Sequence, residues 1–325
     1  MSAEAIYDAI VEETSQLLVG NEDAVEALTI ALLTDGHVLI EGVPGVAKTT
    51  IANLFAHAAN LEYQRIQMTP DVLPADITGT HIYREKTGEF ELQKGPVFAN
   101  VVLADEINRA TPKTQSALLE AMEEGQTTIE GETLSLPDPF IVVATQNPIE
   151  YEGTFALPEA QRDRFQFKVV VDLPERSAER EILQRFDQSP SLTPSDISNV
   201  IDVADIDAAR QEVENVHVDD KLFDYILDLV AATRNHEAIE FGASPRASLA
   251  FLHAGKAAAA IRGRDYAIPD DIKRLAPLIL SHRLVLDTEA EISGRDPREI
   301  AAEVVETVST PEYELRETPR AADDD

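Results

Sequence analysis

The chain has no cysteine and no tryptophan among its 325 residues. The absence of cysteine excludes disulfide bonds and thiolate metal sites. The 7 histidines lack the close spacing of metal ligands, so we expect no structural metal. No apolar run reaches the length of about 18 residues that a membrane-spanning helix needs, and the N-terminus lacks a signal-peptide pattern. We therefore expect a cytoplasmic protein without a membrane span.

Basic residues are also scarce. Aspartate and glutamate number 60 against 27 lysines and arginines, of which only 8 are lysines, and the formal net charge is −33. The acidic residues are spread along the chain, whereas an acidic docking surface would form a block. Molar salt shortens the Debye length to about 3 Å and makes such repulsion tolerable, so the composition favours the cytosol of a halophilic archaeon. The same charge argues against nucleic acid as a partner, because non-specific binding needs basic patches.

The most informative motif follows an apolar run and precedes a helix expected to begin near Thr50. It comprises Gly42, Val43, Pro44, Gly45, Val46, Ala47, Lys48 and Thr49. A strand, a glycine-containing loop and a helix in this order predict a phosphate-binding loop. Backbone N–H groups would surround the phosphates, Lys48 would reach the terminal phosphates and Thr49 would ligate Mg²⁺. We expect this loop, including Thr50, to bind a nucleoside triphosphate.

Ala47 departs from the usual pattern, which has glycine before the lysine. Alanine adds only a methyl group near the phosphates and is tolerated there if its φ is that of an ordinary helical residue. We therefore expect Ala47 to have a helical φ.

A second apolar run, residues 101–104, ends in Asp105 and Glu106. It predicts a buried parallel strand with two acids at its carboxyl end, where ligands bind in open α/β sheets. Asp105 would hold Mg²⁺ together with Thr49, and Glu106 would accept a proton from the attacking water. Adjacent acids at a strand end are also ordinary surface residues. The phosphate-binding loop upstream favours the catalytic interpretation.

Further apolar runs at residues 63–68, 140–147 and 167–171 predict the remaining strands. Asn147 is placed to orient the attacking water or to sense the γ-phosphate, although a residue before proline is also a common turn former. The predicted fold class is α/β. It is a P-loop NTPase with a parallel five-stranded sheet and flanking helices, followed by a small α-helical lid.

These residues resemble the MoxR family of AAA+ ATPases over most of residues 20–172. The matching segments are Gly42–Thr49, Lys94–Phe98, Ala104–Ala110, Gln115–Met122, Ala144–Pro148 and Leu157–Phe165. Ala47 also fits the pattern of this family.

The resemblance implies an ATPase that uses ATP and Mg²⁺ and assembles as a homo-oligomeric ring, commonly a hexamer, with ATP sites at subunit interfaces. Arg164 is then the candidate arginine finger that reaches a neighbour's γ-phosphate, with Arg162 as the local rival. Residues 242–246 resemble the second sensor motif, so Arg246 would contact the γ-phosphate from the lid and couple hydrolysis to lid rotation. Without the resemblance, these arginines could be surface residues.

The same comparison suggests the domain organisation. We expect an AAA+ core over residues 1–172 that begins with a helix and carries a helix-2 insert at about 69–91 and a β-hairpin insert at about 124–136. Amphipathic segments predict an α-helical lid over residues 173–313, and residues 314–325 read as a disordered acidic tail. The inserts either contact substrate or form long surface loops.

MoxR-like proteins imply chaperone-like remodelling, assembly or activation of partner proteins, for which a separate protein with a von Willebrand factor A domain is a candidate. The client itself cannot be read from the sequence. Two alternatives remain: a nucleic-acid or chelatase-type AAA+ motor, and a nucleotide-gated scaffold with little hydrolysis. Stimulation of the ATPase by DNA would favour a nucleic-acid motor, whereas intact Glu106, Asn147 and Arg164 argue against the scaffold.

Overall fold

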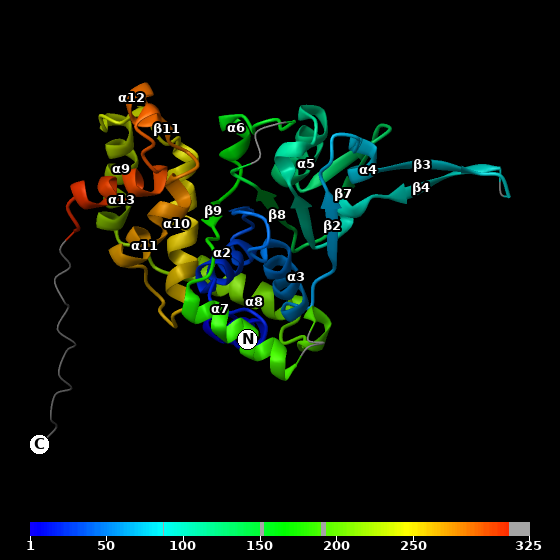
Figure 1. Ribbon diagram of the computed structural model, residues 1–325, viewed down its shortest axis with the longest axis horizontal. Coiled ribbons are helices and arrows are strands. Elements are labelled where there is room, and N and C mark those ends of the chain that lie inside the picture. The colour runs from blue at the N-terminus through cyan, green and yellow to red at the C-terminus, as the bar shows by residue number, and fades with distance from the viewer. Residues whose placement is uncertain (87, 150–152, 190–192, 312–325) are drawn as a thin grey trace, which may run out of the picture.

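The computed structural model describes residues 1–86, 88–149, 153–189 and 193–311. The tail expected over residues 314–325 lies outside this part of the chain. Figure 1 places the sheet and its flanking helices on one side of the molecule and helices α9 to α13 on the other. No helix in the described ranges is both long and apolar enough to cross a membrane.

The centre of the molecule is a five-stranded sheet with the order β2-β5-β8-β1-β9. Its strands are β1 (Val38–Glu41), β2 (Tyr63–Gln67), β5 (Val101–Asp105), β8 (Ile141–Gln146) and β9 (Phe167–Val170). Every neighbouring pair is parallel, so all carboxyl ends meet at one edge of the sheet. The predicted five-stranded parallel sheet is therefore confirmed.

Helices cover both faces of this sheet, which explains why its central strands are apolar along their length. Alternate side chains of a strand point to opposite faces. Val101 and Leu103 belong to a core with α1 (Ala3–Thr14), α2 (Glu22–Leu33) and α3 (Lys48–Ala58). Val102 and Ala104 belong to a second core with α5 (Pro112–Glu124).

Two β-hairpins leave the sheet domain. After α4 (Pro74–Thr78), strands β3 (Gly79–Arg84) and β4 (Glu89–Lys94) form a hairpin that projects away from the rest of the molecule (Figure 1). Its strands carry an exposed aromatic pair, Tyr83 and Phe90, with ring centroids 5.4 Å apart. A short 3₁₀ helix, η1 (Pro96–Phe98), leads from it into β5. The second hairpin, β6 (Gln126–Ile129) and β7 (Glu132–Ser135), follows α5.

The remaining elements are mostly helical. They are η2 (Ile107–Arg109), α6 (Glu159–Arg162), α7 (Arg176–Gln188), η3 (Pro194–Asp196), α8 (Val203–Asn215), α9 (Asp220–Asn235), β10 (Ile239–Phe241), α10 (Pro245–Ala260), α11 (Pro269–Leu280), β11 (Val285–Leu286), α12 (Thr288–Ile292) and α13 (Pro297–Thr307). Helices α8, α12 and α13 and the antiparallel pair β10–β11 were not predicted from the sequence. Helix α8 contacts α1 and α2 as well as α10, so the chain after β9 first returns across the sheet domain.

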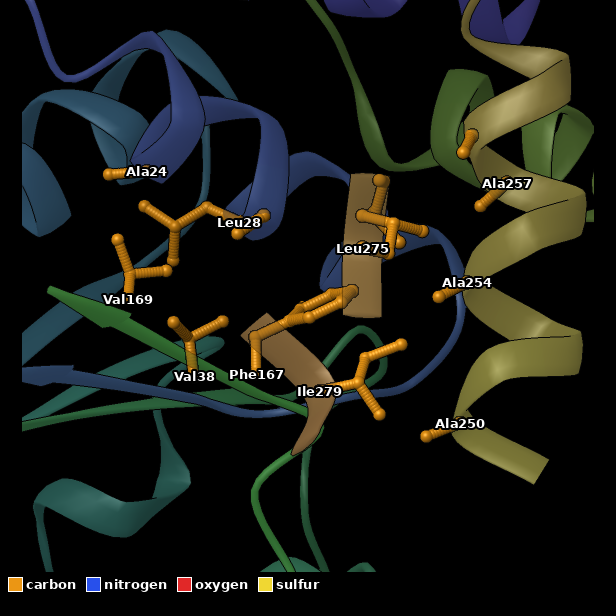
Figure 2. Close-up of a cluster of buried hydrophobic side chains, with 14 of the residues drawn as sticks. Ala24, Leu28, Val38, Phe167, Val169, Ala250, Ala254, Ala257, Leu275 and Ile279 are labelled. Carbon is orange, nitrogen blue, oxygen red and sulfur yellow. The ribbon is translucent and has the colours of Figure 1, made fainter. Parts of the chain in front are cut away.

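The lid helices pack directly on the sheet domain. Figure 2 shows Ala254 and Ala257 of α10 on the side of Leu275 of α11, and Ala250 beside Ile279 of α11, with Phe167 of β9 nearby. Small alanine side chains allow α10 and α11 to approach closely. This apolar contact joins the lid to the edge of the sheet that ends in β9.

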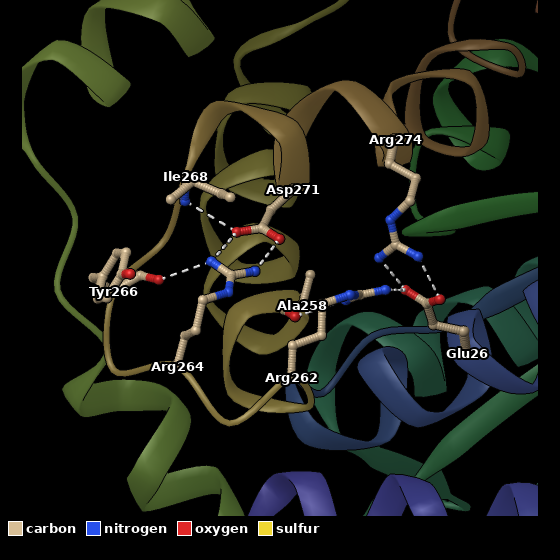
Figure 3. Close-up of polar contacts among 8 residues, drawn as sticks. All are labelled: Glu26, Ala258, Arg262, Arg264, Tyr266, Ile268, Asp271 and Arg274. Atoms are coloured by element: carbon tan, nitrogen blue, oxygen red, sulfur yellow. Dashed lines mark hydrogen bonds and ion pairs between the residues drawn. The ribbon is translucent and has the colours of Figure 1, made fainter. Parts of the chain in front are cut away.

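Two partly exposed arginines paired with one buried carboxylate reinforce the same contact (Figure 3). Glu26 on α2 accepts hydrogen bonds from Arg262, after α10, at 3.0 Å and from Arg274 on α11 at 2.6 Å. Burial acts to raise the pKa of Glu26, but the two arginines outweigh it and hold that pKa below its usual value. Removing either arginine would leave a poorly compensated buried carboxylate, so this network makes the lid contact specific.

Candidate nucleotide site and arginine cluster

The predicted phosphate-binding loop connects β1, which lies between β8 and β9, to the first turn of α3. Gly42 has no room for a side chain, because a Cβ there would lie 2.5 Å from the carbonyl oxygen of Val171. Gly45 has a φ of +90°, a conformation that glycine adopts without strain. Glycine is therefore required at the two positions for different reasons: close packing at Gly42 and the positive φ of the turn at Gly45.

Ala47 does not have the ordinary helical φ that we expected. Its φ is +64° and its ψ is 21°, which is the left-handed region. The chain needs this conformation to turn from the loop into α3, and alternation of right- and left-handed residues directs successive N–H groups into one concavity. For alanine the conformation costs about 1–2 kcal/mol, because the Cβ approaches the following carbonyl oxygen.

Lys48 begins α3 and folds back over its own loop. Its ammonium group donates hydrogen bonds to the carbonyl oxygen of Gly42 and, at 3.0 Å, to that of Val43. Gly42 and Val43 thus hold the lysine through their carbonyl groups, and they are not among the described residues that line the adjacent cavity. The carbonyl groups of the loop therefore orient the lysine.

Asp105, at the end of β5, is almost fully buried and accepts hydrogen bonds from side chains on two strands and one helix. Thr145 on β8 donates to Oδ1 at 2.5 Å. Oδ2 accepts from Thr49 on α3 at 3.3 Å and from the Nε and Nη2 atoms of Arg65 on β2 at 3.0 and 2.6 Å. The carboxylate therefore joins the phosphate-binding loop to the two strands that flank β5.

Glu106 follows in a left-handed conformation, with a φ of +58°. Strained backbone of this kind persists only where the surrounding structure holds it. Here its N–H donates to Thr145 Oγ1 at 2.8 Å, and its Oε2 accepts from Gln67 Nε2 and Arg109 Nη1, each at 2.9 Å. The turn aims the Glu106 side chain differently from that of Asp105 and places it beside two donors.

These groups surround a cavity of about 430 Å³, which we call the phosphate-loop cavity. It is lined by Pro44, Gly45, Val46, Ala47, Lys48, Thr49, Thr50, Asp105, Glu106 and Asn147. Asn147 is buried, and its Oδ1 accepts a hydrogen bond from the N–H of Ile149 at 3.1 Å. It therefore acts as a turn former and also reaches the cavity, so the two interpretations of this residue are compatible.

The donor set of the cavity fits a Mg²⁺ ion with a nucleotide. Thr49 Oγ1 and Asp105 Oδ2 are hard oxygen ligands that lie 3.3 Å apart. Two ligands of one Mg²⁺ ion, each about 2.0–2.1 Å from the metal, have a similar separation. The loop N–H groups and the lysine supply the positive side of a phosphate site. One group competes with a metal at this point, because the Arg65 guanidinium already occupies Oδ2.

The predicted finger and sensor arginines lie together elsewhere. Arg164 Nη2 lies 2.8 Å from Oε2 of Glu123, at the end of α5, and Arg246 Nη2 lies 2.5 Å from the other oxygen of the same carboxylate. Arg164 also donates to the carbonyl oxygen of Leu119 at 2.6 Å. We call Glu123, Arg164 and Arg246 the arginine cluster. The hydrogen bond from Arg246 is the main cause of a lowered pKa at Glu123, and the charge of Arg164 adds to it.

The arginine cluster is separate from the phosphate-loop cavity. Arg164 and Glu123 line a different hollow of about 470 Å³, whose other described residues come from α5, β6 and α6. The rival Arg162 is half-buried, and its Nε has no hydrogen-bond partner among the described residues. The structure thus brings Gly45 to Thr50, Asp105, Glu106 and Asn147 together, and it brings Arg164 and Arg246 together at a second place.

Several residues at these sites were missed from the sequence. Arg65 and Gln67 are two residues apart on β2, so their side chains point to the same face of the sheet, where they bind Asp105 and Glu106 respectively. Two polar residues at alternate positions of a parallel strand were the available signal. Thr145 and Glu123 gave none, since a threonine in a strand and a glutamate in an acidic helix are ordinary.

Comparison with known proteins supports a common origin for this arrangement. The model of the ATPase family associated with various cellular activities (AAA) matches residues 37–167, and that of the AAA lid domain matches residues 231–304. The chain is 47% identical over 301 residues to the uncharacterized protein YeaC of Bacillus subtilis, covering 93% of each. It is 45% identical over 309 residues to chaperone MoxR1 of Mycobacterium tuberculosis, covering 92% of this chain and 81% of that one.

A crystal structure from Cytophaga hutchinsonii has the same fold, with a TM-score of 0.88, 40% identity and coverage of 95% of this chain and 96% of that one. Similarity at this level extends over both the sheet domain and the lid. The chain belongs to the MoxR family of AAA+ ATPases.

Proposed function

We propose that this protein is a ring-forming, Mg²⁺-dependent ATPase that couples ATP hydrolysis to chaperone-like remodelling, assembly or activation of other proteins. The observation that carries the proposal is the phosphate-loop cavity, in which a phosphate-binding loop, two acids and an amide converge from the carboxyl ends of neighbouring strands. This is where open α/β sheets bind ligands. The name chaperone MoxR1 of a relative supports the remodelling role.

In this proposal each group of the cavity has one task. Loop N–H groups and Lys48 bind the phosphates, and Glu106 accepts a proton from the attacking water, which Asn147 orients. Mg²⁺ held by Thr49 and Asp105 would neutralise phosphate charge. Gln67 and Arg109 hold the Glu106 carboxylate in place.

The separation of the arginine cluster from this cavity supports assembly. Arg164 and Arg246 share Glu123 and would therefore face the same ligand. We propose that this ligand is the γ-phosphate bound to the next subunit, so that Arg164 acts as the arginine finger in trans and Arg246 reaches the same phosphate. An arginine of this kind neutralises charge that develops in the transition state. Hydrolysis would then require a ring, which we expect to be a hexamer.

The acidic composition supports a high-salt setting. We propose that the protein works in a halophilic cytosol and that residues 1–172 belong to its core. Within residues 173–313 we propose that α9 to α13 form the lid, because α8 contacts α1 and α2 of the sheet domain. A separate protein with a von Willebrand factor A domain remains a candidate partner.

The experiment that tests the function is ATPase rate against protein concentration in molar KCl with Mg²⁺, with particle mass measured by light scattering in the same samples. The per-subunit rate should rise as rings form. A folded protein that binds ATP but stays monomeric and inactive at all concentrations would contradict self-assembly into an active ring, and would point to a missing partner or to a nucleotide-gated scaffold. Strong stimulation by DNA would favour a nucleic-acid motor instead.

Lys48→Ala is the control for the site in this experiment. It removes the ammonium group from the loop, so a titration with a fluorescent ATP analogue should show no saturable binding under the same conditions. Unchanged affinity in the variant would remove this loop from the nucleotide site.

A further inference from the structure

The turn that carries the candidate finger is held by the lid through one carboxylate. Asp163, immediately before Arg164, accepts a hydrogen bond at Oδ1 from Arg283 Nε at 2.7 Å. Its Oδ2 accepts from Ser244 Oγ at 2.8 Å. Arg283 follows α11, and Ser244 caps the N-terminus of α10. Both oxygens of Asp163 are therefore bound by lid residues.

Arg283 fixes the same turn through its other donors. Its side chain is 3% exposed, and its Nη2 and Nη1 atoms donate to the carbonyl oxygens of Phe165 at 2.7 Å and Gln166 at 3.1 Å. The ring Nε2 of the adjacent His282 lies 2.9 Å from the carbonyl oxygen of Phe165. Burial lowers the pKa of Arg283, and the hydrogen bond to Asp163 opposes that effect. A buried guanidinium is costly unless it is paired, so these contacts hold the turn firmly against the lid.

Ser244 extends the connection to the second arginine. While its Oγ donates to Asp163, the same oxygen accepts from the N–H of Arg246 at 3.1 Å. Glu123 then joins Arg246 to Arg164 through its two oxygens. The contacts form a closed circuit of hydrogen bonds and ion pairs, from Asp163 through Ser244, Arg246 and Glu123 to Arg164. Arg164 directly follows Asp163 in the chain.

We infer that Asp163 is a positioning residue, which joins the finger turn to the first turn of α10 so that Arg164 and Arg246 meet one anion together. This inference rests on the proposed role of Arg164 in trans. The Glu123 carboxylate shows the spacing at which the two guanidinium groups converge on one small anion. Arginine binds carboxylate and phosphate with similar geometry, so a phosphate group of a neighbouring subunit could replace Glu123 there.

The test is the ATPase activity of the full chain in assembled rings, with kcat and KM for ATP measured separately. Asp163→Ala should lower kcat by about 10- to 100-fold, the loss expected when a catalytic group is misplaced by about 1 Å. KM should stay within about 2-fold, because the phosphate-loop cavity is untouched. Ser244→Ala is the milder variant, which leaves Arg283 paired, and it should show the same pattern. Ser244→Thr keeps the hydroxyl group and should restore kcat.

A combined variant separates positioning from general destabilisation. In a protein that already carries Arg164→Ala and Arg246→Ala, adding Asp163→Ala should cause no further loss of kcat, because the groups through which it acts are gone. A further loss as large as in the otherwise unmodified chain would overturn the inference, as would wild-type kcat in both Asp163→Ala and Ser244→Ala. If Arg164→Ala alone kept full turnover, the proposed trans finger would fail first, and this inference would fall with it.

Discussion

The phosphate-loop cavity and the arginine cluster are built in different ways. The cavity is formed by segments at the carboxyl ends of strands in one sheet, and hydrogen bonds between those segments hold its charged side chains. The cluster joins α5 and the turn after α6 to the first turn of α10, so it depends on how the lid sits on the sheet domain. In the proposed function the cavity binds the nucleotide by itself, whereas the cluster holds two arginine side chains that lie outside the phosphate-loop cavity. The difference implies that mutations should separate nucleotide binding from hydrolysis.

The largest expected effect comes from breaking the arginine half of this comparison. Arg164→Ala should lower kcat in assembled protein by about 10³- to 10⁵-fold, the range seen for removal of an arginine finger. Nucleotide affinity should be nearly unchanged, because Arg164 is not among the described residues lining the phosphate-loop cavity. Single-turnover hydrolysis and equilibrium binding measured on the same preparation give both quantities.

Two controls make this result specific. Arg180→Ala removes an exposed arginine from α7 and should leave turnover unchanged. Arg162→Ala tests the rival residue on the same turn. If Arg162→Ala abolished turnover while Arg164→Ala did not, the finger would be reassigned. Rings that mix Arg164→Ala and Glu106→Gln subunits should recover activity only where an intact Arg164 faces an intact Glu106, and no dependence on mixing would contradict the trans geometry.

The next largest effect should come from a substitution in the phosphate-loop cavity. Glu106→Gln should lower kcat by about 10²- to 10⁴-fold, because the amide cannot accept the proton that the carboxylate takes from water. ATP should still bind, since the phosphate-binding loop is intact. Glu12→Gln, at an exposed position of α1, is the matched control and should behave as wild type. Wild-type turnover in Glu106→Gln would exclude this residue as the base.

The sheet and much of the cavity could be predicted from the sequence because their signals are local. Strands buried on both faces must be apolar, so β5 and β8 stand out as runs of Val, Ile, Leu and Ala. In a parallel sheet the carboxyl ends coincide, and this rule alone places Asp105 and Asn147 near the loop after β1. Helix α8 was missed although its buried residues, Ile206, Ala209 and Val213, have the i, i+3, i+7 spacing of an amphipathic helix, so a signal for it was present in the sequence.

The pairings between distant segments could not be predicted. Arg65 and Asp105 are 40 positions apart, and Arg246 and Glu123 are 123 positions apart. The sequence contains many acids that could pair with either arginine, and only the packed structure selects one. The left-handed φ of Ala47 was missed, although the glycine that usually precedes the lysine indicated that the turn needs such a conformation.

A smaller effect should come from Arg65, whose guanidinium gives the cavity an internal counter-ion as Glu123 does for the arginine cluster. Arg65→Ala frees Asp105 Oδ2, so the Mg²⁺ concentration needed for half-maximal nucleotide binding should fall by up to about 5-fold, which corresponds to an ion pair of about 1 kcal/mol. Arg65→Lys keeps a positive charge with fewer hydrogen-bond donors, so its Mg²⁺ requirement should lie between those of the wild type and Arg65→Ala. A fluorescent nucleotide titrated at several Mg²⁺ concentrations gives this value. A higher Mg²⁺ requirement in Arg65→Ala would mean that the arginine assists binding.

The smallest expected effect concerns the strain in the loop itself. Ala47→Gly removes a Cβ from a residue with a φ of +64° and should relieve about 1–2 kcal/mol of backbone strain. Glycine also makes the unfolded chain more flexible, which lowers the unfolding free energy by about 0.4–1 kcal/mol. The net gain in unfolding free energy should therefore be about 0.5–1 kcal/mol. Ala302→Gly, at an exposed position inside α13, is the matched control and should lose about 1 kcal/mol, because there glycine relieves no strain. Urea unfolding in molar KCl should therefore show that the unfolding free energy rises in Ala47→Gly and falls in Ala302→Gly. A loss of stability in Ala47→Gly would show that the left-handed turn carries little strain, and the loop would then be as well served by alanine as by glycine.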